Sequence, residues 1–521
     1  MSIRLETPQA AVDWLRARVP GRLVVDSRLI SPGDGLIAWP GAAVDGRQFV
    51  PQALAAGAAA CLVEHRDVES FNFDSDSVAC YDGLKAATGP IAAAWHEHPS
   101  EQLDVFAVTG TNGKTSTAWW LAQVLSGLDA TQEQPVGLIG TLGVGLLRGK
   151  DAPQLESIGG LTTPDPVELQ RAFRRFVRAG ALACAIEASS IGLAEHRLDA
   201  TRIQVALFTN LSQDHLDYHG SMPVYWQAKQ RLFDWPGLQA AVINVDDAYG
   251  VELAKSLQAR SSVDVWTVAR TRPARLQAQR IEQSADALCF DVVCADDGDV
   301  QTVETGLLGL YNVSNLLGVI AALRARGVPL LKAARACAAL TPVPGRLQRV
   351  PAPLGHPMVL VDFAHTPDAL TQVLSTLQPI ARQRGGQLHC VFGCGGDRDR
   401  SKRAPMAAAV EQHADRVVLT SDNPRSENPR AIIEQARQGL QQPDRVRVEP
   451  DRAQAIRRVV HEAASADVIC IAGKGHETTQ EIGGRKFAFS DAAVAAEALA
   501  LRPVAQHFGS GVGVVGCGAA A

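Results

Sequence analysis

The stretch Asp104-Val-Phe-Ala-Val-Thr-Gly-Thr-Asn-Gly-Lys-Thr-Ser-Thr117 constrains the fold of this chain more than any other. Residues 105–108 are largely apolar and run directly into a loop that contains Gly110 and Gly113, after which residues 118–125 have the apolar spacing of a buried helix. This order of strand, loop and helix is typical of a phosphate-binding loop, because glycines let backbone N–H groups point into one concavity. We therefore predict an α/β fold whose parallel sheet is built around this loop.

The loop residues have the chemistry to bind a nucleoside triphosphate. Lys114 can reach the terminal phosphates, and the hydroxyl of Thr115 or Ser116 can hold Mg²⁺. The motif is the short form G-x-x-G-K-T, since Val108 stands where a longer phosphate loop has glycine. The alternative is a glycine-rich turn before a helix, but the preceding apolar strand favours phosphate binding. The predicted triphosphate contacts are Gly110, Thr111, Asn112, Gly113, Lys114, Thr115 and Ser116.

The length of 521 residues is too great for one ordinary core, and at about 150 residues per domain we expect three domains. Hydrophobic residues make up 46% and charged residues 20%, so each domain can bury a core of its own. The net charge of −5 gives no electrostatic footprint for nucleic acid or an anionic membrane. Small molecules are therefore the expected partners.

The ten cysteines stand singly in apolar runs, without a C-x-x-C pair or a Cys/His cluster with zinc spacing. Cys390 and Cys394 are close in sequence, and we interpret them as core residues at a strand end. This usage predicts a reduced, cytoplasmic protein. The N-terminus lacks the pattern of a signal peptide, and no apolar run reaches the roughly 20 residues that cross a bilayer, so we expect no membrane span.

Residues 1–102 have the pattern of a small α/β domain. Short β-like runs alternate with Gly/Pro turns, and residues 53–60 followed by 61–64 predict a helix and then a strand. Taken alone, Asp26, Ser27 and Arg28 predict a turn with a surface ion pair.

Residues 103–344 alternate between strand and helix patterns and form the predicted nucleotide-binding domain. We expect strands at 181–187, 205–210 and 240–245, and helices at 166–179, 224–233 and 315–327. This alternation implies a parallel sheet covered on both faces, with ligands at the carboxyl ends of its strands. Glu187 and His215 follow two of these strands and are candidate Mg²⁺ ligands, although His215 taken alone favours a capping or core histidine.

Residues 345–505 show a third α/β pattern. We expect strands at 358–363, 388–392, 416–420 and 468–472, and helices that include 367–377 and 429–440. All four strands are followed by polar clusters, which predicts a second half-site that faces the triphosphate domain. Residues 506–521 are low in complexity, and we expect them to be disordered.

Together these motifs resemble the Mur ligase family, the ATP-dependent enzymes that form amide bonds in the synthesis of peptidoglycan precursors. The resemblance covers residues 26–491 and rests on Asp26-Ser-Arg with Pro32-Gly-Asp34, Thr162-Thr-Pro-Asp165, Asp362-Phe-Ala-His-Thr-Pro-Asp368 and Asp422-Asn-Pro-Arg425. Within the family, this set is most similar to the enzymes that add the third residue of the stem peptide. The resemblance implies an N-terminal domain for the UDP end of the substrate, a central ATPase domain and a Rossmann-like C-terminal domain for the incoming amino acid.

The resemblance also implies a reaction and its cofactors, ATP and Mg²⁺. ATP would phosphorylate the carboxylate of UDP-MurNAc-L-Ala-D-Glu, and the amine of the third amino acid would attack the acyl phosphate. We expect the domains to close around the substrates, and we expect a monomer.

Residue roles follow from the matching motifs. The implied catalytic residues are Lys114, Glu187, His215 and Lys229, of which Lys229 would be carbamylated and so become an anion that faces the metal. Thr115, Glu187, His215 and the carbamate would hold Mg²⁺. A solvated helix lysine is the alternative for Lys229. Further implied ATP contacts are Asn312, Asn315, Arg346 and Asp362, and implied contacts of the UDP-substrate are Ser27, Thr162, Thr163, Ser189 and Arg197.

The implied amino-acid site matches the family members that take meso-diaminopimelate. Its residues are Arg398, Asp422, Asn423, Pro424, Arg425, Gly473 and Glu477. Meso-diaminopimelate carries a far-end carboxylate that lysine lacks, so Arg425 can pair with it and is left unpaired when lysine enters. Three residues depart from the family pattern: Ile191, Glu195 and Gln348 stand where histidine, glutamine and glutamate are common.

Two other readings remain at this point. A P-loop protein that uses ATP only as a switch explains Lys114, but it leaves Glu187, Lys229 and the Asp-Asn-Pro-Arg cluster without a role. A lysine-adding or folate-polyglutamate-type ligase of the same family is the second, and Arg425 and the Asp26-Ser-Arg motif count against it.

Overall fold

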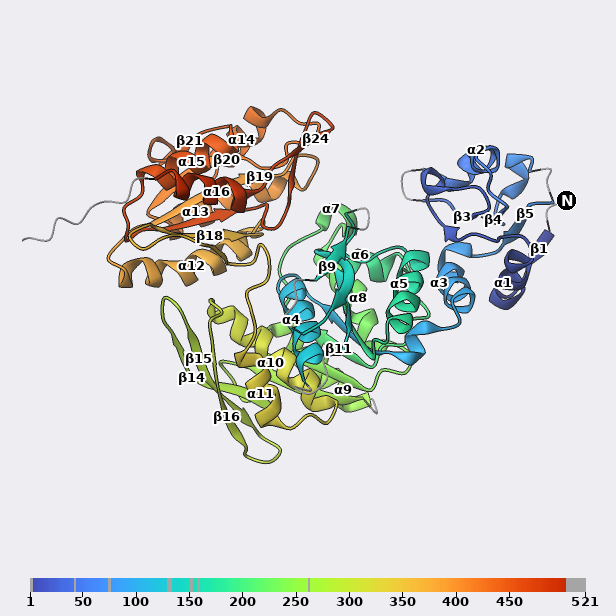
Figure 1. Ribbon diagram of the computed structural model, residues 1–521, viewed down its shortest axis with the longest axis horizontal. Helices are drawn as coiled ribbons and strands as arrows, with labels where there is room; N and C mark the ends of the chain where they lie inside the picture. Colours follow the sequence, from blue (N-terminus) through green and yellow to red (C-terminus); the bar gives the residue numbers. More distant parts are fainter. Residues whose placement is uncertain are drawn as a thin grey trace, which may run out of the picture. The chain divides into compact units, whose positions relative to one another are not determined.

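The computed structural model describes residues 3–41, 44–73, 76–128, 134–149, 153–157, 160–260 and 263–502 (Figure 1). The chain separates into two compact units, with the boundary between Val343 and Pro344. The tail predicted to be disordered, residues 506–521, lies outside the described residues, as do residues 503–505.

The first unit contains two sheets, of which the N-terminal one has five strands. Their order is β1 (Ile3–Leu5), β5 (Val78–Tyr81), β4 (Ala60–Glu64), β3 (Gly35–Ala38) and β2 (Leu23–Val24), and all pairings are parallel. Helices α1 (Pro8–Arg16) and α3 (Leu84–Trp95) share one hydrophobic core with this sheet, and α2 (Val50–Ala55) belongs to a second core.

Two local predictions for this region can be compared with the structure. The helix predicted over residues 53–60 ends at Ala55, because Gly57 adopts a φ of 96° and Ala60 already belongs to β4. The predicted surface ion pair is present, since Arg28 Nη2 lies 2.7 Å from Asp26 Oδ2 and the Arg28 side chain is exposed.

The second sheet has eleven strands and a parallel centre. Strand β6 (Asp104–Thr109) lies between β10 (Ala183–Glu187) and β11 (Val205–Phe208) and is parallel to both. The full order is β16 (Val300–Thr305), β15 (Leu288–Cys294), β14 (Leu276–Gln283), β13 (Asp264–Ala269), β12 (Ala240–Asn244), β11, β6, β10, β7 (Val136–Gly140), β8 (Gly143–Leu147) and β9 (Gln154–Glu156). The antiparallel pairs lie at the two edges.

Strand β6 is buried on both faces because successive side chains point to opposite sides of a sheet. Phe106 and Val108 belong to one core, and Val105 and Ala107 belong to the other. The first core includes residues of α4 (Lys114–Gly127), α10 (Leu310–Ala325) and α11 (Leu330–Ala338), and the second includes residues of α5 (Pro166–Arg178), α8 (Met222–Gln230) and α9 (Ala248–Arg260). The predicted α/β fold with helices on both faces of a parallel sheet is confirmed.

Two helices that pack on this sheet begin earlier in the sequence than the apolar pattern indicates. The helix expected from residue 118 begins at Lys114, and the helix expected from residue 315 begins at Leu310. In both cases a glycine with positive φ stands immediately before the helix, Gly113 at 84° and Gly309 at 99°. The helix predicted over 224–233 spans Met222–Gln230 and continues as a 3₁₀ turn over Arg231–Asp234.

The second unit is built on a six-stranded sheet. Its order is β17 (Gln348–Val350), β18 (Met358–Asp362), β22 (Val468–Ala472), β19 (Leu388–Cys394), β20 (Arg416–Ser421) and β21 (Arg447–Val448), and only the first pairing is antiparallel. Helices α15 (Arg452–Glu462) and α16 (Asp491–Ala500) share a core with this sheet. Helix α12 (Pro367–Gln383) contacts β19 and β22, α14 (Pro429–Arg437) contacts β19 and β20, and α13 (Arg403–His413) packs between α12 and α14.

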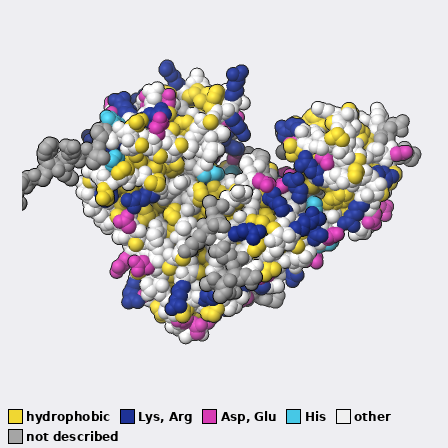
Figure 2. Space-filling model, viewed as in Figure 1, with side chains coloured by type: hydrophobic (Ala, Val, Ile, Leu, Met, Phe, Trp, Pro, Cys, Tyr) yellow, Lys and Arg dark blue, Asp and Glu magenta, His cyan; other side chains and the backbone are white. Residues whose placement is uncertain are grey.

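A short hairpin, β23 (Thr479–Ile482) and β24 (Arg485–Ala488), follows the sheet of the second unit. Cys390 and Cys394 both lie buried on β19, as expected of core residues. Figure 2 shows basic, acidic and hydrophobic side chains interspersed on the visible face. Within the described ranges, no helix combines the length and the apolar character that crossing a bilayer requires.

Candidate active site

The loop that follows β6 is shaped by the loop that follows β11. Thr209 Oγ1 donates a hydrogen bond of 2.6 Å to the carbonyl of Asn112, and the Asn112 N–H donates one of 2.9 Å to Asn210 Oδ1. Gly110 has a φ of 146°, and a Cβ there would lie 1.9 Å from Thr209 Oγ1. Only glycine fits at this position, so the loop has the close backbone approach that phosphate binding needs.

Lys114 is the first residue of α4 and lies over this loop. Its Nζ donates hydrogen bonds of 2.9 Å to the Gly110 carbonyl and 2.8 Å to the Thr111 carbonyl. The helix N-terminus adds positive potential at the same place. Ser116, in the first turn of the same helix, is 7% exposed. The loop therefore has the charge and the backbone geometry that a triphosphate requires.

Thr115 and Glu187 meet at the carboxyl ends of neighbouring parallel strands. Thr115 Oγ1 donates a hydrogen bond of 3.0 Å to Glu187 Oε2, and the Thr141 N–H donates one of 2.7 Å to Glu187 Oε1. Glu187 is 1% exposed. A hydroxyl and a carboxylate are oxygen ligands of the kind that Mg²⁺ prefers. Among the described residues, no group of three or more His, Cys, Asp or Glu side chains is placed to hold a metal ion.

Lys229 lies on α8 and is 1% exposed, so the alternative of a solvated helix lysine is wrong. Its Nζ donates a hydrogen bond of 2.7 Å to the Gly110 carbonyl and lies 4.4 Å from the ring centroid of Tyr225. Burial lowers the pKa of Lys229 well below its ordinary value, the neighbouring Lys114 lowers it further, and Asp214 opposes the shift. The amine is therefore able to be uncharged beside the phosphate loop.

His215 lies at the start of α7 (Leu216–His219) with a φ of 52°. Its side chain is 44% exposed, its Nε2 is 3.5 Å from Asp214 Oδ2, and it makes no capping hydrogen bond. A buried core histidine and a capping histidine are thus both excluded. Its ring centroid is 6.3 Å from that of Tyr225, whose hydroxyl lies 3.1 Å from Thr111 Oγ1 in the phosphate loop.

The two asparagines that the family resemblance implies as ATP contacts lie near the start of α10, next to the phosphate loop. Asn315 Nδ2 donates a hydrogen bond of 2.9 Å to Asn312 Oδ1. A Cβ on Gly113 would lie 2.5 Å from Asn315 Oδ1, so the asparagine pair reaches the backbone of the loop.

The predicted substrate residues Thr163, Ser189 and Arg197 gather beside Glu187. Thr163 Oγ1 donates to the Glu187 carbonyl at 2.7 Å and lies 3.0 Å from Ser189 Oγ, and Arg197 Nη1 donates to the Thr163 carbonyl at 3.0 Å. Thr162 Oγ1 lies 3.2 Å from Thr141 Oγ1, which itself bonds Glu187. Among the described residues, no side-chain hydrogen bond joins Ser27 to this group.

Glu195, one of the departures from the family pattern, makes an ion pair that glutamine could not. Its Oε2 lies 2.7 Å from Lys85 Nζ on α3, and Tyr218 donates a hydrogen bond to its Oε1. Burial raises the pKa of Glu195, but the hydrogen bonds from Lys85 and Tyr218 outweigh it and the net pKa is lowered. The carboxylate therefore links α3 to the end of α6 (Ser190–Ala194). Gln348, another departure, accepts a hydrogen bond of 2.8 Å from the Gly345 N–H.

Asp362 ends β18 in the second unit and is 4% exposed. It accepts hydrogen bonds of 2.7 Å from the N–H groups of Leu347 and Ala364. Burial raises its pKa, and the nearby Arg346 opposes the shift. Arg346 itself stacks on the ring of Phe363 at 4.5 Å.

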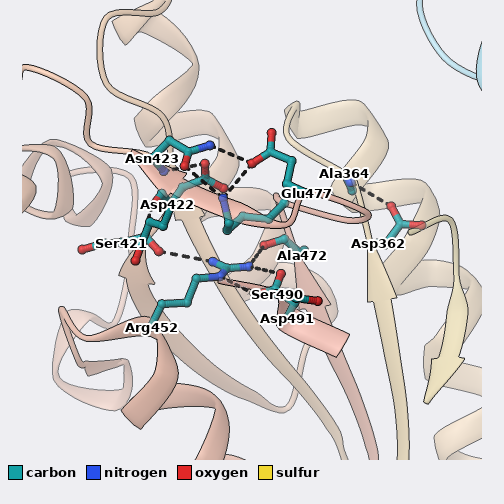
Figure 3. A network of polar contacts seen from close by, with 12 residues as sticks. Asp362, Ala364, Ser421, Asp422, Asn423, Arg452, Ala472, Glu477, Ser490 and Asp491 are labelled. Atoms are coloured by element: carbon teal, nitrogen blue, oxygen red, sulfur yellow. Dashed lines mark hydrogen bonds and ion pairs between the residues drawn. The ribbon is translucent and has the colours of Figure 1, made fainter. Parts of the chain in front are cut away.

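Three predicted residues of the amino-acid site, Asp422, Asn423 and Glu477, lie together near the ends of β20 and β22 (Figure 3), and a fourth, Gly473, directly follows β22. Asn423 Nδ2 donates a hydrogen bond of 2.8 Å to Glu477 Oε2, and the Asn423 N–H donates one of 2.6 Å to Asp422 Oδ1. Gly473 has a φ of 117°, and a Cβ there would lie 2.5 Å from Asp422 Oδ2. Glycine at this position therefore lets the acidic side chain approach the end of β22.

Arg425 adopts a left-handed φ of 53° on the loop that leads to α14. Its Nη1 donates to the Gly396 carbonyl at 2.7 Å, and its Nε lies 3.9 Å from Glu481 Oε2. A Cβ on Gly395 would lie 3.2 Å from Arg425 Nη1 and 3.6 Å from Arg398 Cγ, so the two predicted arginines flank one glycine. The Pro424 carbonyl packs against Gly396, where a Cβ would lie 1.9 Å away.

Two features of this site were not predicted from the sequence. Lys474 is 0% exposed and bonds both Asn423 and Glu477, although it lies within the polar cluster at 473–477 that signals the strand end. Arg452 and Asp491 form a fully buried ion pair of 2.7 Å beneath the strand ends, where Arg452 also donates to the carbonyls of Ser421 and Ala472 (Figure 3). No sequence signal links these two residues, because they begin two separate helices.

Comparison with family models finds three matches in chain order. Residues 22–92 match the model described as Mur ligase family, catalytic domain, residues 108–323 match the Mur ligase middle domain, and residues 345–475 match the Mur ligase, glutamate ligase domain.

Similar proteins cover nearly the whole chain. A protein of Acidovorax sp. (strain JS42) is 57% identical over 502 residues, which are 96% of this chain and 98% of that protein. A protein of Janthinobacterium sp. (strain Marseille) is 45% identical over 518 residues, 96% of this chain and 99% of that one. Both bear the name UDP-N-acetylmuramoyl-L-alanyl-D-glutamate–2,6-diaminopimelate ligase.

Solved structures agree in fold. One structure of a UDP-N-acetylmuramoyl-L-alanyl-D-glutamate–2,6-diaminopimelate ligase is 35% identical, has a TM-score of 0.62 and covers 92% of this chain and 94% of its own. The MurF structure from Acinetobacter baumannii has the same TM-score of 0.62 at 17% identity, with 91% of this chain and 96% of its own covered, which is a likeness of fold alone.

Proposed function

The chain belongs to the Mur ligase family, and we propose that it joins meso-diaminopimelate to UDP-MurNAc-L-Ala-D-Glu while ATP is converted to ADP and phosphate. The chain is an ATP-dependent, amide-forming ligase of peptidoglycan precursor synthesis. The observation that carries the choice of substrates is the 57% identity over 96% of the chain to a ligase that is named for them. We place the reaction in the cytoplasm and assign it to a monomer.

In this proposal each of three regions binds a different substrate. Residues 1–102 hold the UDP end of the substrate, residues 103–344 hold ATP, and residues 345–505 hold the amino acid. The phosphate loop of the second region and the polar strand ends of the third region support this division. The assignment of Arg346 and Asp362 to ATP, and of Ser27 to the UDP-substrate, rests on the family resemblance alone.

The chemistry needs activation because a carboxylate is a poor electrophile. Transfer of the terminal phosphoryl group of ATP to the substrate carboxylate forms an acyl phosphate and ADP, which supplies a good leaving group. The amine of the amino acid then attacks the acyl carbon, and phosphate departs from the tetrahedral intermediate. Because little covalent chemistry is left to the protein, positioning and charge neutralisation are its main contributions.

Lys114 is the residue that neutralises the transferring phosphoryl group. Its ammonium now bonds the carbonyls of Gly110 and Thr111, the two loop residues over which the phosphates would lie. Phosphate oxygens are stronger acceptors than these carbonyls, so Lys114 would exchange one set of partners for the other.

The residues beside the loop fit a magnesium ion. Thr115 and Glu187 supply a hydroxyl and a carboxylate 3.0 Å apart, and His215 lies on the loop that follows β11. Bound Mg²⁺ would neutralise phosphate charge and orient the terminal phosphate. Lys229 fits the proposed carbamate, because burial lowers its pKa and only an uncharged amine can add to carbon dioxide. Carbamylation would convert a buried cation into a buried anion suited to a metal.

Arg425 is the proposed determinant of amino-acid choice. Its guanidinium is only partly occupied by Gly396 and Glu481, and its side chain is 23% exposed. A bidentate pair with the far-end carboxylate of meso-diaminopimelate would stabilise that substrate, whereas L-lysine would leave the arginine unpaired. Glu477, with its side chain 31% exposed, would accept from an ammonium group of the same amino acid.

The proposal is tested by incubating the purified chain with ATP, Mg²⁺, UDP-MurNAc-L-Ala-D-Glu and meso-diaminopimelate, and following both ADP and the nucleotide-linked tripeptide by mass spectrometry. We expect one ADP per tripeptide, and no ADP above background when either the acceptor or the amine is omitted. ADP release that is independent of both would support the switch alternative instead. Tripeptide formed only with L-lysine would identify a lysine-adding ligase.

A further inference from the structure

The buried ammonium of Lys474 has no role in the reaction described above. It follows β22, is 0% exposed, and donates three hydrogen bonds, to Glu477 Oε2 at 2.6 Å, Asn423 Oδ1 at 2.9 Å and the Thr479 carbonyl at 2.8 Å. These are as many acceptors as a lysine ammonium has donors. A buried charge is costly unless it is paired. This complete set of partners therefore indicates that the Lys474 ammonium has a structural or functional role.

The first consequence concerns Asn423. Its Oδ1 accepts from both Lys474 Nζ and the Glu481 N–H, the latter at 3.0 Å. With two donors facing Oδ1, the amide cannot be reversed without placing its own N–H groups against them. Nδ2 is therefore held toward Glu477, as Figure 3 shows for Asn423 and Glu477.

The second consequence concerns Glu477. Its Oε2 accepts from both Lys474 and Asn423, whereas its Oε1 has no hydrogen-bond partner among the described residues. Because the side chain remains 31% exposed, one carboxylate oxygen is fixed by the protein and the other is open to a ligand. An open carboxylate oxygen is an acceptor for an ammonium group.

The third consequence links this acceptor to Arg425. Lys474 bonds the first residue of β23, and the Arg425 N–H donates to the Glu481 carbonyl of the same strand at 3.0 Å. Strand β23 therefore connects Lys474, which holds Glu477, with the backbone of Arg425. We expect this connection to fix the distance between the open oxygen of Glu477 and the guanidinium of Arg425. A diamino dicarboxylic acid presents both an ammonium and a carboxylate at its far end, which is the pair of groups that such a spacing could select.

We propose that Lys474 is a positioning residue that orients Asn423 and Glu477 to bind an ammonium group of the incoming amino acid. The inference rests on the proposed function and adds to it a residue that touches no substrate. Lys474 acts through Glu477, so its effect should depend on the Glu477 carboxylate.

The test is a double-mutant cycle with Lys474→Met, Glu477→Gln and the double variant, read as KM for each substrate. Loss of a hydrogen bond to a charged group should raise KM for meso-diaminopimelate by about tenfold or more in Lys474→Met, with KM for ATP and for the UDP-substrate changed by less than about twofold. In the Glu477→Gln background, the same substitution should change KM for meso-diaminopimelate by less than about twofold. Lys486→Met, on exposed strand β24, is the matched control and should behave as the unchanged chain does.

Several outcomes would overturn the inference. Equal effects of Lys474→Met in both backgrounds, or equal increases in all three KM values, would show a role that does not pass through Glu477. If Lys474→Met does not fold, Lys474→Gln, which keeps two donors, takes its place, and failure of both to fold would make Lys474 a folding residue. An unchanged chain that makes no tripeptide would overturn the proposed function as well, whereas an active chain with an indifferent Lys474 would overturn the inference alone.

Discussion

Lys229 Nζ and Lys114 Nζ both donate hydrogen bonds to the carbonyl oxygen of Gly110, at 2.7 Å and 2.9 Å. Two amines that share one acceptor repel each other if both are charged, and burial penalises the more enclosed of them. The pKa of Lys229 is lowered by its burial first and by Lys114 second. The phosphate loop thus lies beside one amine suited to bind phosphate and one suited to be modified.

Replacing Lys114 by alanine should abolish synthesis without unfolding the chain. The ammonium donates hydrogen bonds to the carbonyls of Gly110 and Thr111 in the loop, so its loss removes phosphate neutralisation rather than core packing. We expect tripeptide formation to fall at least about 100-fold, with an unchanged far-UV circular dichroism spectrum. Lys255→Ala on α9, a lysine whose side chain is 68% exposed, is the control and should retain activity. Normal turnover by Lys114→Ala would contradict the assignment of the phosphate loop.

Lys229 should carry a carbamate when bicarbonate is present. Because burial lowers its pKa, the amine loses its proton more readily than an exposed lysine does, and it should add carbon dioxide where an exposed lysine does not. ¹³C NMR of the chain in labelled bicarbonate should show one carbamate signal, and Lys229→Met should lose both that signal and, by at least about 100-fold, ligase activity. An active Lys229→Met variant would show that the reaction does not need the modified lysine.

Glu427 should make the second unit sensitive to acid. Hydrogen bonds from Arg403 lower the pKa of Glu427 from its ordinary 4.5 to about 2, although burial opposes them. Since the folded-state pKa lies below the unfolded one, the carboxylate stabilises the fold fully above about pH 4.5, and this contribution is lost as the pH falls toward 2. The unfolding free energy of Glu427→Gln, measured by chemical denaturation, should therefore depend less on pH in that window. Glu434→Gln, at a side chain that is 65% exposed, should follow the unchanged chain, and identical pH profiles for all three proteins would contradict the assignment.

The central strands of the large sheet and four strands of the second unit were predictable because they are short apolar runs that end in polar clusters. Strands β7 to β9 and β13 to β16 were not predicted. The run 468–472 is β22 without any change of boundary, and Ile469 and Ile471 face one core while the strand as a whole is buried. Helix starts were less predictable, since Lys114 and Leu310 begin helices on polar or glycine-flanked segments where apolar periodicity is weak.

The site was predictable where it follows strand ends and less so where burial decides the chemistry. Strand-end position and motif resemblance predict Glu187, Asp422 and Arg425 as site residues, and their catalytic and binding roles remain predictions. The burial of Lys229 could not be deduced from a helix whose sequence is only weakly amphipathic. The ion pair of Glu195 with Lys85 could not be predicted because it depends on α3 lying near the end of α6.

The most direct test of the account compares meso-diaminopimelate with L-lysine as the amine, in the unchanged chain, in Arg425→Ala and in Arg430→Ala. Arg430 is an exposed arginine of α14 and serves as the control. The account predicts that the unchanged chain and Arg430→Ala use meso-diaminopimelate with a kcat/KM at least about 100-fold above that for L-lysine, and that Arg425→Ala loses most of this preference. Equal use of both amines by the unchanged chain, or a preference that survives in Arg425→Ala, would contradict it.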